Sequence, residues 1–255
     1  MKRRVVMLGS GNVATNFALA LKDKCQIVQI YSRTLANAQE LARQVNCEAV
    51  DDLKMVVDDA HIYIIAVNDD AIASVINNTP SNDALWLHTS GSTAIDVFEG
   101  RRDHYGVCWP VQSLSKSNIV KMDDVHLFIE GNSEKTTQEL EKFASAMSHN
   151  VHQASSHDRL LLHIASVFAC NFANHIFTLS SEVLDEAGLS FDIMLPLIKT
   201  MVEKLDHLSP QDSQTGPAAR GDEKIIEKHL SILNSDKRKI YKLLSESIMN
   251  HSKAD

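Results

Sequence analysis

Short apolar runs alternate with helical patterns from the start of the chain to about residue 154. Ile62–Val67 is continuously apolar, which is typical of a strand buried on both faces of a sheet. Leu35–Val45 repeats apolar residues at helical spacing. This alternation predicts a doubly wound, mostly parallel α/β sheet. The expected strands are Arg4–Leu8, Gln26–Tyr31, Cys47–Val50, Ile62–Val67, Ala84–His88, His104–Trp109, Val125–Glu130 and Val151–Gln153, and the expected helices are Val13–Leu21, Leu35–Val45, Asp52–Asp58, Asp70–Asn77 and Glu134–Met147.

The pattern changes after Ser155, where no further strand is expected. A long helix is predicted from His157 to Ala187, with Gly188 as its stop signal. We therefore expect an α/β domain over residues 1–154 and an all-helical domain over residues 155–255. The remaining expected features are a helix from Ser190 to His207 in which Pro196 can introduce a kink, a polar loop at Leu208–Gly221, a helix capped by Asp222, and a last helix at Ile240–Asn250.

A glycine-rich turn, GSGNVA, lies between the first strand and the first helix and reads G-x-G-x-x-A. Gly9 permits a tight turn, Gly11 lets the backbone approach a pyrophosphate, and Ala14 keeps the helix close to the sheet. Free N–H groups at the helix start would bind the anion. The turn predicts a Rossmann-type dinucleotide-binding domain, and the alternative is a tight turn that binds nothing. The residues expected at the dinucleotide are Gly9, Ser10, Gly11, Asn12 and Val13.

The end of the second strand indicates which dinucleotide is bound. NAD sites usually place an acidic residue there to hold the ribose hydroxyls. This chain instead has Ser32, Arg33 and Thr34, which can bind a 2′-phosphate. We predict NADP as the cofactor. The alternative is that Thr34 only caps the next helix while Arg33 is solvated.

Two polar loops follow later strands, and in an open parallel sheet such loops face the ligand. Val67 and Asn68 follow the apolar strand, and the second loop contains His88, Ser90 and Gly91. We expect both loops to surround the ribose and nicotinamide. Their polar side chains could instead only cap the following helices, although capping does not explain His88 or Gly91.

The long helix carries uncharged, small polar residues on one face, which indicates a cleft or an interface rather than a solvated surface. His163, or else His88, could donate a proton to a carbonyl or imine. Asn171 and Asn174 could orient the substrate, and Arg220 in the TGPAARGD segment could clamp a carboxylate. The alternative is a polar seam between packed helices or subunits.

Composition narrows the class of protein. With 25 basic and 33 acidic residues the net charge is −8, which argues against nucleic acid and anionic membrane surfaces as partners. No run of eighteen apolar residues occurs, so no membrane span is expected. The four cysteines form no CxxC pair, consistent with reduced thiols in a cytoplasmic protein, and the 12 histidines lack ligand spacing, so no metal site is expected. The apolar faces after Ser155 predict a homodimer.

The whole chain resembles a family of uncharacterised bacterial proteins described as NADP oxidoreductases. The resemblance rests on four segments: GSGNVATNFA, HTSGS, LLHIASVFACNFANH and TGPAARGDEKIIEKHL. It implies a Rossmann-like domain, a C-terminal helical domain of unknown function, and membership of the 6-phosphogluconate dehydrogenase-like superfamily. Pyrroline-5-carboxylate reductase and ketopantoate reductase are the better-known relatives, which reduce C=N or C=O bonds with NADPH, usually as dimers built through the helical domain.

Two departures from those relatives concern the reaction. Several relatives place a catalytic Lys on the first long helix with Asn four residues later, whereas this helix has His163 and Asn171. Trp109–Pro110 stands where related sequences favour His-Pro. We expect an NADP-dependent oxidoreductase that reduces a small carbonyl or imine substrate. The alternative is a non-catalytic NADP-binding redox sensor or regulatory protein.

Overall fold

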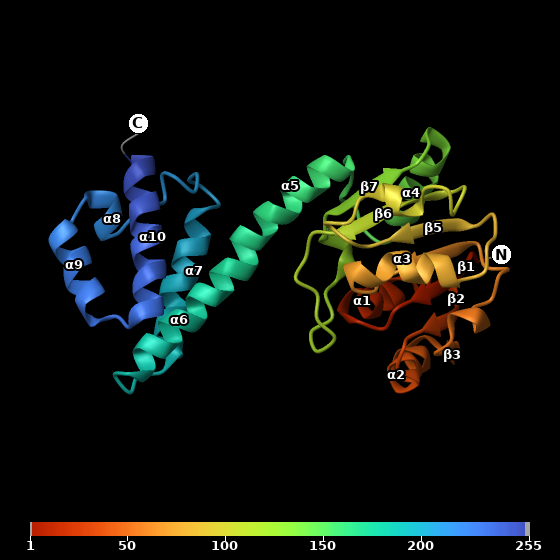
Figure 1. Ribbon diagram of the computed structural model, residues 1–255, viewed down its shortest axis with the longest axis horizontal. Coiled ribbons are helices and arrows are strands. Elements are labelled where there is room, and N and C mark those ends of the chain that lie inside the picture. Colours follow the sequence, from red (N-terminus) through yellow and green to blue (C-terminus); the bar gives the residue numbers. More distant parts are fainter. Residues whose placement is uncertain (1, 253–255) are drawn as a thin grey trace. The chain divides into compact units, whose positions relative to one another are not determined.

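The computed structural model describes residues 2–252, and the chain divides into two compact units between Asn171 and Phe172. The first unit contains one eight-stranded sheet in the order β3-β2-β1-β4-β5-β6-β7-β8 (Figure 1). All neighbouring strands are parallel except β6 and β7. The predicted mostly parallel α/β fold is therefore confirmed. The strands are β1 Arg4–Leu8, β2 Gln26–Tyr31, β3 Glu48–Val50, β4 Ile62–Ile65, β5 Leu85–His88, β6 Tyr105–Pro110, β7 Leu127–Gly131 and β8 Val151–Gln153.

Helices cover both faces of this sheet, so the central strands are buried on each side. In β1, Val5 and Met7 face the core under α1, α2 and α4, while Val6 and Leu8 face the core under α3. This explains why the central strands read as continuous apolar runs. The helices are α1 Asn12–Leu21, α2 Leu35–Val45, α3 Asp69–Asn78 and α4 Glu134–Ser145.

The prediction of a helix at Asp52–Asp58 is wrong, because only the short 3-10 turn Leu53–Met55 forms there. The buried side chain of Gln29 accounts for the difference. Its amide donates to the Met55 carbonyl at 3.1 Å and its oxygen accepts from the Val57 N–H at 3.0 Å. These backbone groups are therefore held by β2 rather than by a continuing helix.

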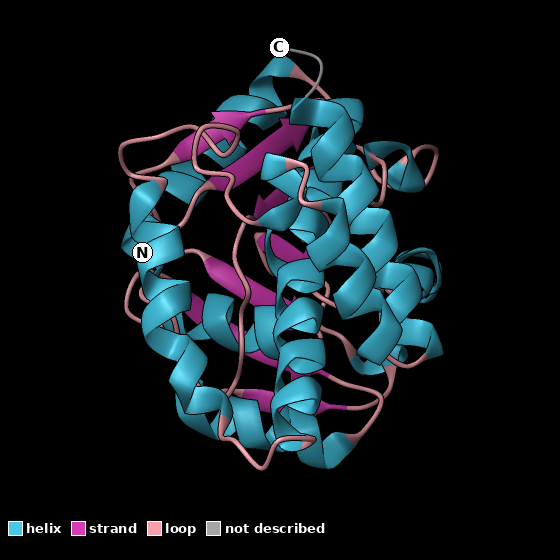
Figure 2. Cartoon of the chain, turned by 90° about the vertical axis from the view of Figure 1, so that its left-hand side faces the viewer, coloured by secondary structure: helices cyan, strands magenta, loops and turns pink. Residues whose placement is uncertain are grey.

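After Ser155 the described residues contain helices and no strands (Figure 2). The predicted long helix forms as α5 Ser156–Ser166 and α6 Ala173–Asp185, joined by a π-helical segment at Val167–Phe172. Ser155 caps it by accepting from the Asp158 N–H. The further helical elements are the 3-10 turn Phe191–Met194, α7 Leu195–Lys204, α8 Pro217–Arg220, α9 Glu223–Ile232 and α10 Ser235–Ser252.

Two details of the helical half differ from expectation. Pro196 lies in the first turn of α7, where its missing N–H costs no hydrogen bond, so it starts the helix rather than kinking it. The expected loop 208–221 contains the short helix α8. Asp222 is the residue before α9, but its side chain makes no capping hydrogen bond and binds Arg220 instead.

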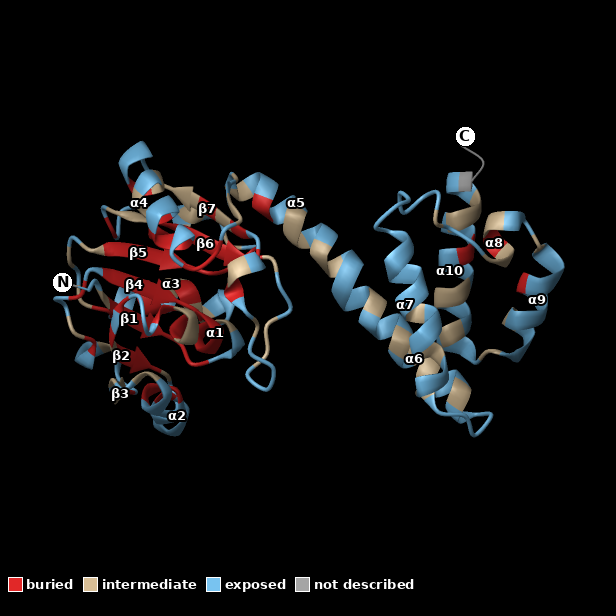
Figure 3. Ribbon diagram, turned by 180° about the vertical axis from the view of Figure 1, so that it is seen from behind, coloured by how far each residue is buried: buried red, intermediate tan, exposed pale blue. Residues whose placement is uncertain are grey.

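Exposed apolar side chains are common on these helices, whereas buried positions concentrate on the sheet (Figure 3). Ser156–Asp185, with a mean hydropathy of 1.5 in its most apolar window, is long and apolar enough to cross a membrane by length and composition. This segment contains no run of eighteen consecutive apolar residues, and the absence of a membrane span stays a prediction. The same composition suits a helix at a subunit interface.

Candidate functional site

A cavity of about 400 Å³ lies at the carboxyl ends of β1, β2 and β4. β1 lies between β2 and β4, so the order of the strands reverses here, which is where open α/β sheets bind their ligands. The volume is within the range of small-molecule pockets. The cavity is lined by Gly9, Ser10, Gly11, Tyr31, Ser32, Arg33, Leu53, Ala66, Val67, Asn68, Ala71, Ser74 and Val75. The structure thus brings seven of the residues expected at the cofactor to one place.

The two glycines of the turn have different causes: packing within the protein requires Gly9, whereas Gly11 faces open space. Gly9 has φ +134°, and a Cβ there would lie 2.1 Å from the Ala66 carbonyl oxygen, so the fold itself demands glycine. A Cβ on Gly11 would meet nothing within 4 Å. The open space at Gly11 is therefore available to a ligand.

The start of α1 is also suited to an anion. Gly11 is its N-cap and offers no side-chain acceptor, and no acidic residue occurs in the first turn. The first backbone N–H groups of a helix need an external acceptor. Asn12 and Val13 begin this helix, although they do not line the cavity.

The end of β2 carries the features expected for a 2′-phosphate. The Ser10 hydroxyl donates to the Ser32 hydroxyl at 2.9 Å, which joins the glycine turn to this strand end. Arg33 is exposed, lines the cavity and forms no salt bridge among residues 2–252. Thr34 precedes α2, but its hydroxyl makes no capping hydrogen bond. Side-chain capping therefore does not account for Thr34, which lies outside the cavity lining.

The loop after β4 adjoins the loop after β5. Asn68 precedes α3 without a capping hydrogen bond from its side chain, so capping does not explain it. The Ser92 hydroxyl donates to the Asp69 carboxylate, which links the two loops. Ser90 accepts from the N–H groups of Ser92 and Thr93, at 3.1 and 2.9 Å. The Ser90 hydroxyl thus shapes its own turn.

His88 is completely buried at the end of β5. Burial, helped by the nearby charge of Arg159, lowers the pKa of His88 to about 3. Its Nδ1 accepts from the Ser90 N–H at 3.2 Å. His88 is therefore neutral at physiological pH and organises the loop, which argues against His88 as the proton donor.

His163 lies against the loop after β5 and the end of β6. Its ring meets the Trp109 ring edge-on, with centroids 5.8 Å apart. A Cβ on Gly91 would lie 2.6 Å from Trp109 Cε2 and 2.8 Å from His163 Cδ2. Glycine at position 91 thus permits the close approach of both rings. The structure brings His163 and Gly91 together at the carboxyl edge of the sheet, where the cofactor cavity also lies.

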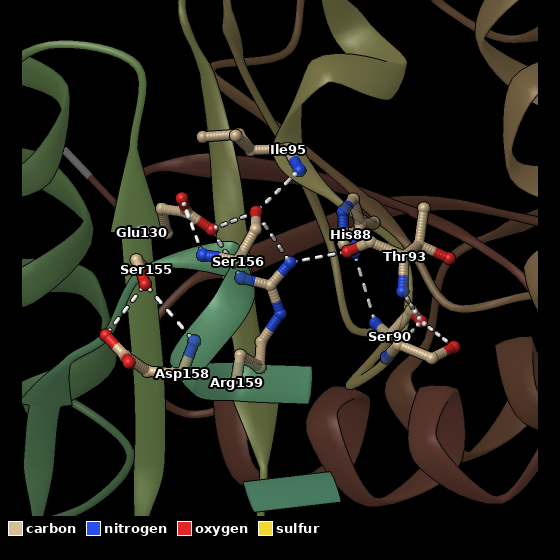
Figure 4. Close-up of polar contacts among 10 residues, drawn as sticks. His88, Ser90, Thr93, Ile95, Glu130, Ser155, Ser156, Asp158 and Arg159 are labelled. Carbon is tan, nitrogen blue, oxygen red and sulfur yellow. Dashed lines mark hydrogen bonds and ion pairs between the residues drawn. The ribbon is translucent and has the colours of Figure 1, made fainter. Parts of the chain in front are cut away.

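A buried ion pair fixes the start of α5 (Figure 4). The Arg159 side chain is 1% exposed, pairs with the Glu130 carboxylate on β7, and donates to the Thr93 carbonyl. Glu130 also accepts from the N–H and hydroxyl of Ser156, at 2.9 and 2.7 Å. The Ser156 hydroxyl in turn accepts from the Ile95 N–H at 3.0 Å. These contacts tie α5 to both the sheet and the loop after β5.

The same contacts position His163. Arg159 and His163 are four residues apart on α5 and therefore share one face of the helix. Sequence patterns did not reveal this arrangement. Trp109 lies 54 residues before His163, and Arg159 stands 29 residues from Glu130 along the chain, so local patterns do not link either pair.

The remaining residues expected at the substrate are not assembled around His163 in the first unit. Asn171 is exposed in the π-helical segment that ends this unit. Asn174 and Arg220 belong to the second unit and are also exposed. The Arg220 guanidinium contacts the Asp222 carboxylate at 2.9 Å, an exposed pair that a ligand could displace at small cost. Their contact with substrate stays a prediction.

Comparison with known proteins assigns both parts of the chain. Residues 3–79 match an oxidoreductase family with an NAD-binding Rossmann fold, and residues 125–248 match a domain of unknown function, DUF2520. None of the curated proteins compared with the sequence matches it.

Solved structures agree with this assignment. A candidate NADP oxidoreductase from Bacteroides fragilis is 40% identical over 98% of both chains, with a TM-score of 0.90. Pyrroline-5-carboxylate reductase from Streptococcus pyogenes is 11% identical over 99% of both chains, with a TM-score of 0.67. A reductive aminase from Aspergillus terreus in complex with NADPH is 11% identical over 99% of this chain and 88% of its own, with a TM-score of 0.66.

The two more distant structures show a shared fold, whereas the Bacteroides match covers nearly the whole chain at high identity. The predicted family resemblance is therefore confirmed. The chain belongs to the same family as the Bacteroides fragilis candidate NADP oxidoreductase, with an NAD-binding Rossmann domain followed by a DUF2520 domain.

Proposed function

We propose that this protein is an NADP-dependent oxidoreductase that reduces a small carbonyl or imine substrate by hydride transfer. The observation that carries the proposal is the single cavity shared by the glycine turn, Arg33 and the loop after β4. The NADPH named for the Aspergillus complex supports the choice of cofactor.

Each part of this cavity has a role in the proposal. The N–H groups at the start of α1 hold the pyrophosphate, and Arg33 and Ser32 in the cavity lining hold the 2′-phosphate. Thr34, which follows Arg33 outside the lining, is proposed to add a hydroxyl donor. Val67 and Asn68 adjoin the ribose and nicotinamide. Bound NADPH supplies the hydride.

His163 supplies the proton in this scheme. As the substrate is reduced, its carbonyl oxygen or imine nitrogen would take a proton from the His163 ring. Trp109 contacts that ring at the edge of the sheet, and Gly91 leaves room for both rings. Arg220, Asn171 and Asn174 are proposed to orient the substrate, with Arg220 pairing to an acidic group.

We further propose a homodimer built through the helices after Ser155, acting in the cytoplasm on a small molecule. Large apolar side chains exposed there include Leu197, Ile232 and Leu243, which are 65–70% exposed. A second copy would remove such surfaces from water. The net charge of −8 favours neither nucleic acid nor an anionic membrane as the partner.

The direct test is turnover. Purified protein is mixed with NADPH and a panel of small ketones and cyclic imines, with and without carboxylate groups, while absorbance of the reduced nicotinamide is followed. We expect oxidation of NADPH with a subset of the panel and loss of that activity in His163→Phe. NADPH binding without turnover on any substrate would favour the sensor function.

A further inference from the structure

We propose that residues 111–121, the first part of the β6–β7 loop, form a second wall of the dinucleotide site and that Lys116 binds the cofactor pyrophosphate. The inference rests on the proposed function and adds to it a binding group from outside the glycine turn. Figure 1 shows this loop near α1, and hydrogen bonds join the two.

Side chains from α1 hold the loop in place. The Asn12 side-chain oxygen accepts from the Lys116 N–H at 3.2 Å. Asn16, one turn later and 1% exposed, donates to the Ser115 carbonyl at 3.1 Å and accepts from the Val120 N–H at 3.0 Å. The loop is thus fixed at three backbone positions to the first two turns of the helix that follows the glycine turn.

Apolar contacts also hold the same loop against the core of the first unit. Leu114 and Val120 pack against the core under α1, as does Val13 in the first turn of that helix. Between them, the hydroxyls of Ser115 and Ser117 are 2.7 Å apart, which forms a tight turn around Lys116. The backbone of Lys116 is therefore held beside the first turn of α1.

Charge is what the glycine turn lacks. Residues 9–14 carry no charged side chain, and the first turn of α1 contains no acidic residue. Backbone N–H groups alone would face a doubly charged pyrophosphate. Lys116 has a flexible four-carbon stem ending in an ammonium, forms no salt bridge among the described residues, and is anchored at Asn12. Because the backbone of Lys116 is held beside the first turn of α1, we assign its ammonium the role of neutralising that charge.

The two coenzymes provide a sharp test, because NADH and NADPH share the pyrophosphate and differ only in the 2′-phosphate. Isothermal titration of Lys116→Gln should show weaker binding of both coenzymes by about the same factor, roughly 5-fold, as for a partly exposed ion pair. Raising the salt concentration should reduce the difference in coenzyme affinity between the wild-type protein and Lys116→Gln. Lys116→Arg should retain most of the affinity.

Lys121→Ala is the matched control. It removes a lysine at the other end of the same loop, where an exposed ammonium lies 4.0 Å from Asp123, and it should leave both affinities unchanged. Unchanged binding in Lys116→Gln would overturn the inference while the proposed function stands. Loss of NADPH affinity alone would assign Lys116 to the 2′-phosphate and also overturn it. Wild-type protein that binds neither coenzyme would overturn both proposals.

Discussion

Glu130→Gln isolates the ion pair that holds α5 on the sheet. The substitution keeps the shape of the side chain but leaves the buried Arg159 guanidinium without a counter-charge. Neutralising one partner of a buried ion pair costs about 3–5 kcal/mol. Arg159 is 1% exposed, whereas Glu130 is 18% exposed and retains some access to water. We therefore expect a loss near the lower limit, about 3 kcal/mol in the free energy of unfolding.

Urea unfolding followed by tryptophan fluorescence measures this loss. The two tryptophans, Trp86 and Trp109, both lie in the first unit, so the signal reports on the unit that contains the ion pair. Asp59→Asn is the matched control, since the Arg4–Asp59 pair is 35% and 60% exposed and should contribute about 0–1 kcal/mol.

A second variant separates loss of the charge pair from loss of shape. Combining Glu130→Gln with Arg159→Met should be less destabilising than Glu130→Gln alone, because no unpaired charge remains buried. A Glu130→Gln variant as stable as Asp59→Asn would refute the reasoning. It would mean that the ion pair does not hold the start of α5.

Three further predictions concern the turn, the buried imidazole and the assembly. Gly11→Val should abolish dinucleotide binding and leave the thermal unfolding midpoint nearly unchanged, because a Cβ at this position meets no protein atom within 4 Å; normal binding by the folded variant would make the turn purely structural. Burial lowers the pKa of His88 from 6.5 to about 3, so the unfolded state binds more protons between these values. The free energy of unfolding of the wild-type protein, measured by urea unfolding, should then fall by about 2 kcal/mol from pH 7 to pH 5, and that of His88→Asn should fall by less. An equal decrease in the two proteins would contradict this prediction. Light scattering at micromolar concentration should give the mass of a dimer, and a monomer would contradict the proposed interface.

Local patterns were sufficient to predict the order of strands and helices and the glycine turn. The central strands of the first unit are apolar because both of their faces are buried, and GSGNVA carries its own geometric requirement at Gly9. The helix predicted after β3, at Asp52–Asp58, does not form because its backbone groups bind Gln29, a residue far away along the chain. Periodicity cannot report such a long-range hydrogen bond.

The candidate site was only partly predictable for the same reason. Residues next to strand ends were identified because a parallel sheet places those ends together. The contact of His163 with Trp109, and the pairing of Arg159 with Glu130, depend on how α5 meets the sheet. The docking of the β6–β7 loop on Asn12 and Asn16 depends on side-chain hydrogen bonds across about a hundred residues. The periodic pattern of apolar and polar residues does not predict any of these contacts.

Coenzyme titration of the wild-type protein and Arg33→Ala tests the central claim most directly. We predict that the wild-type protein binds NADPH more tightly than NADH, because Arg33 lines the cavity with no acidic residue beside it at the end of β2. Arg33→Ala should lose about 1.5–3 kcal/mol of NADPH binding free energy, as for a hydrogen bond to a charged group, and little of NADH binding. Equal affinities of the wild-type protein for the two coenzymes would contradict the assignment of this protein as an NADP-dependent oxidoreductase.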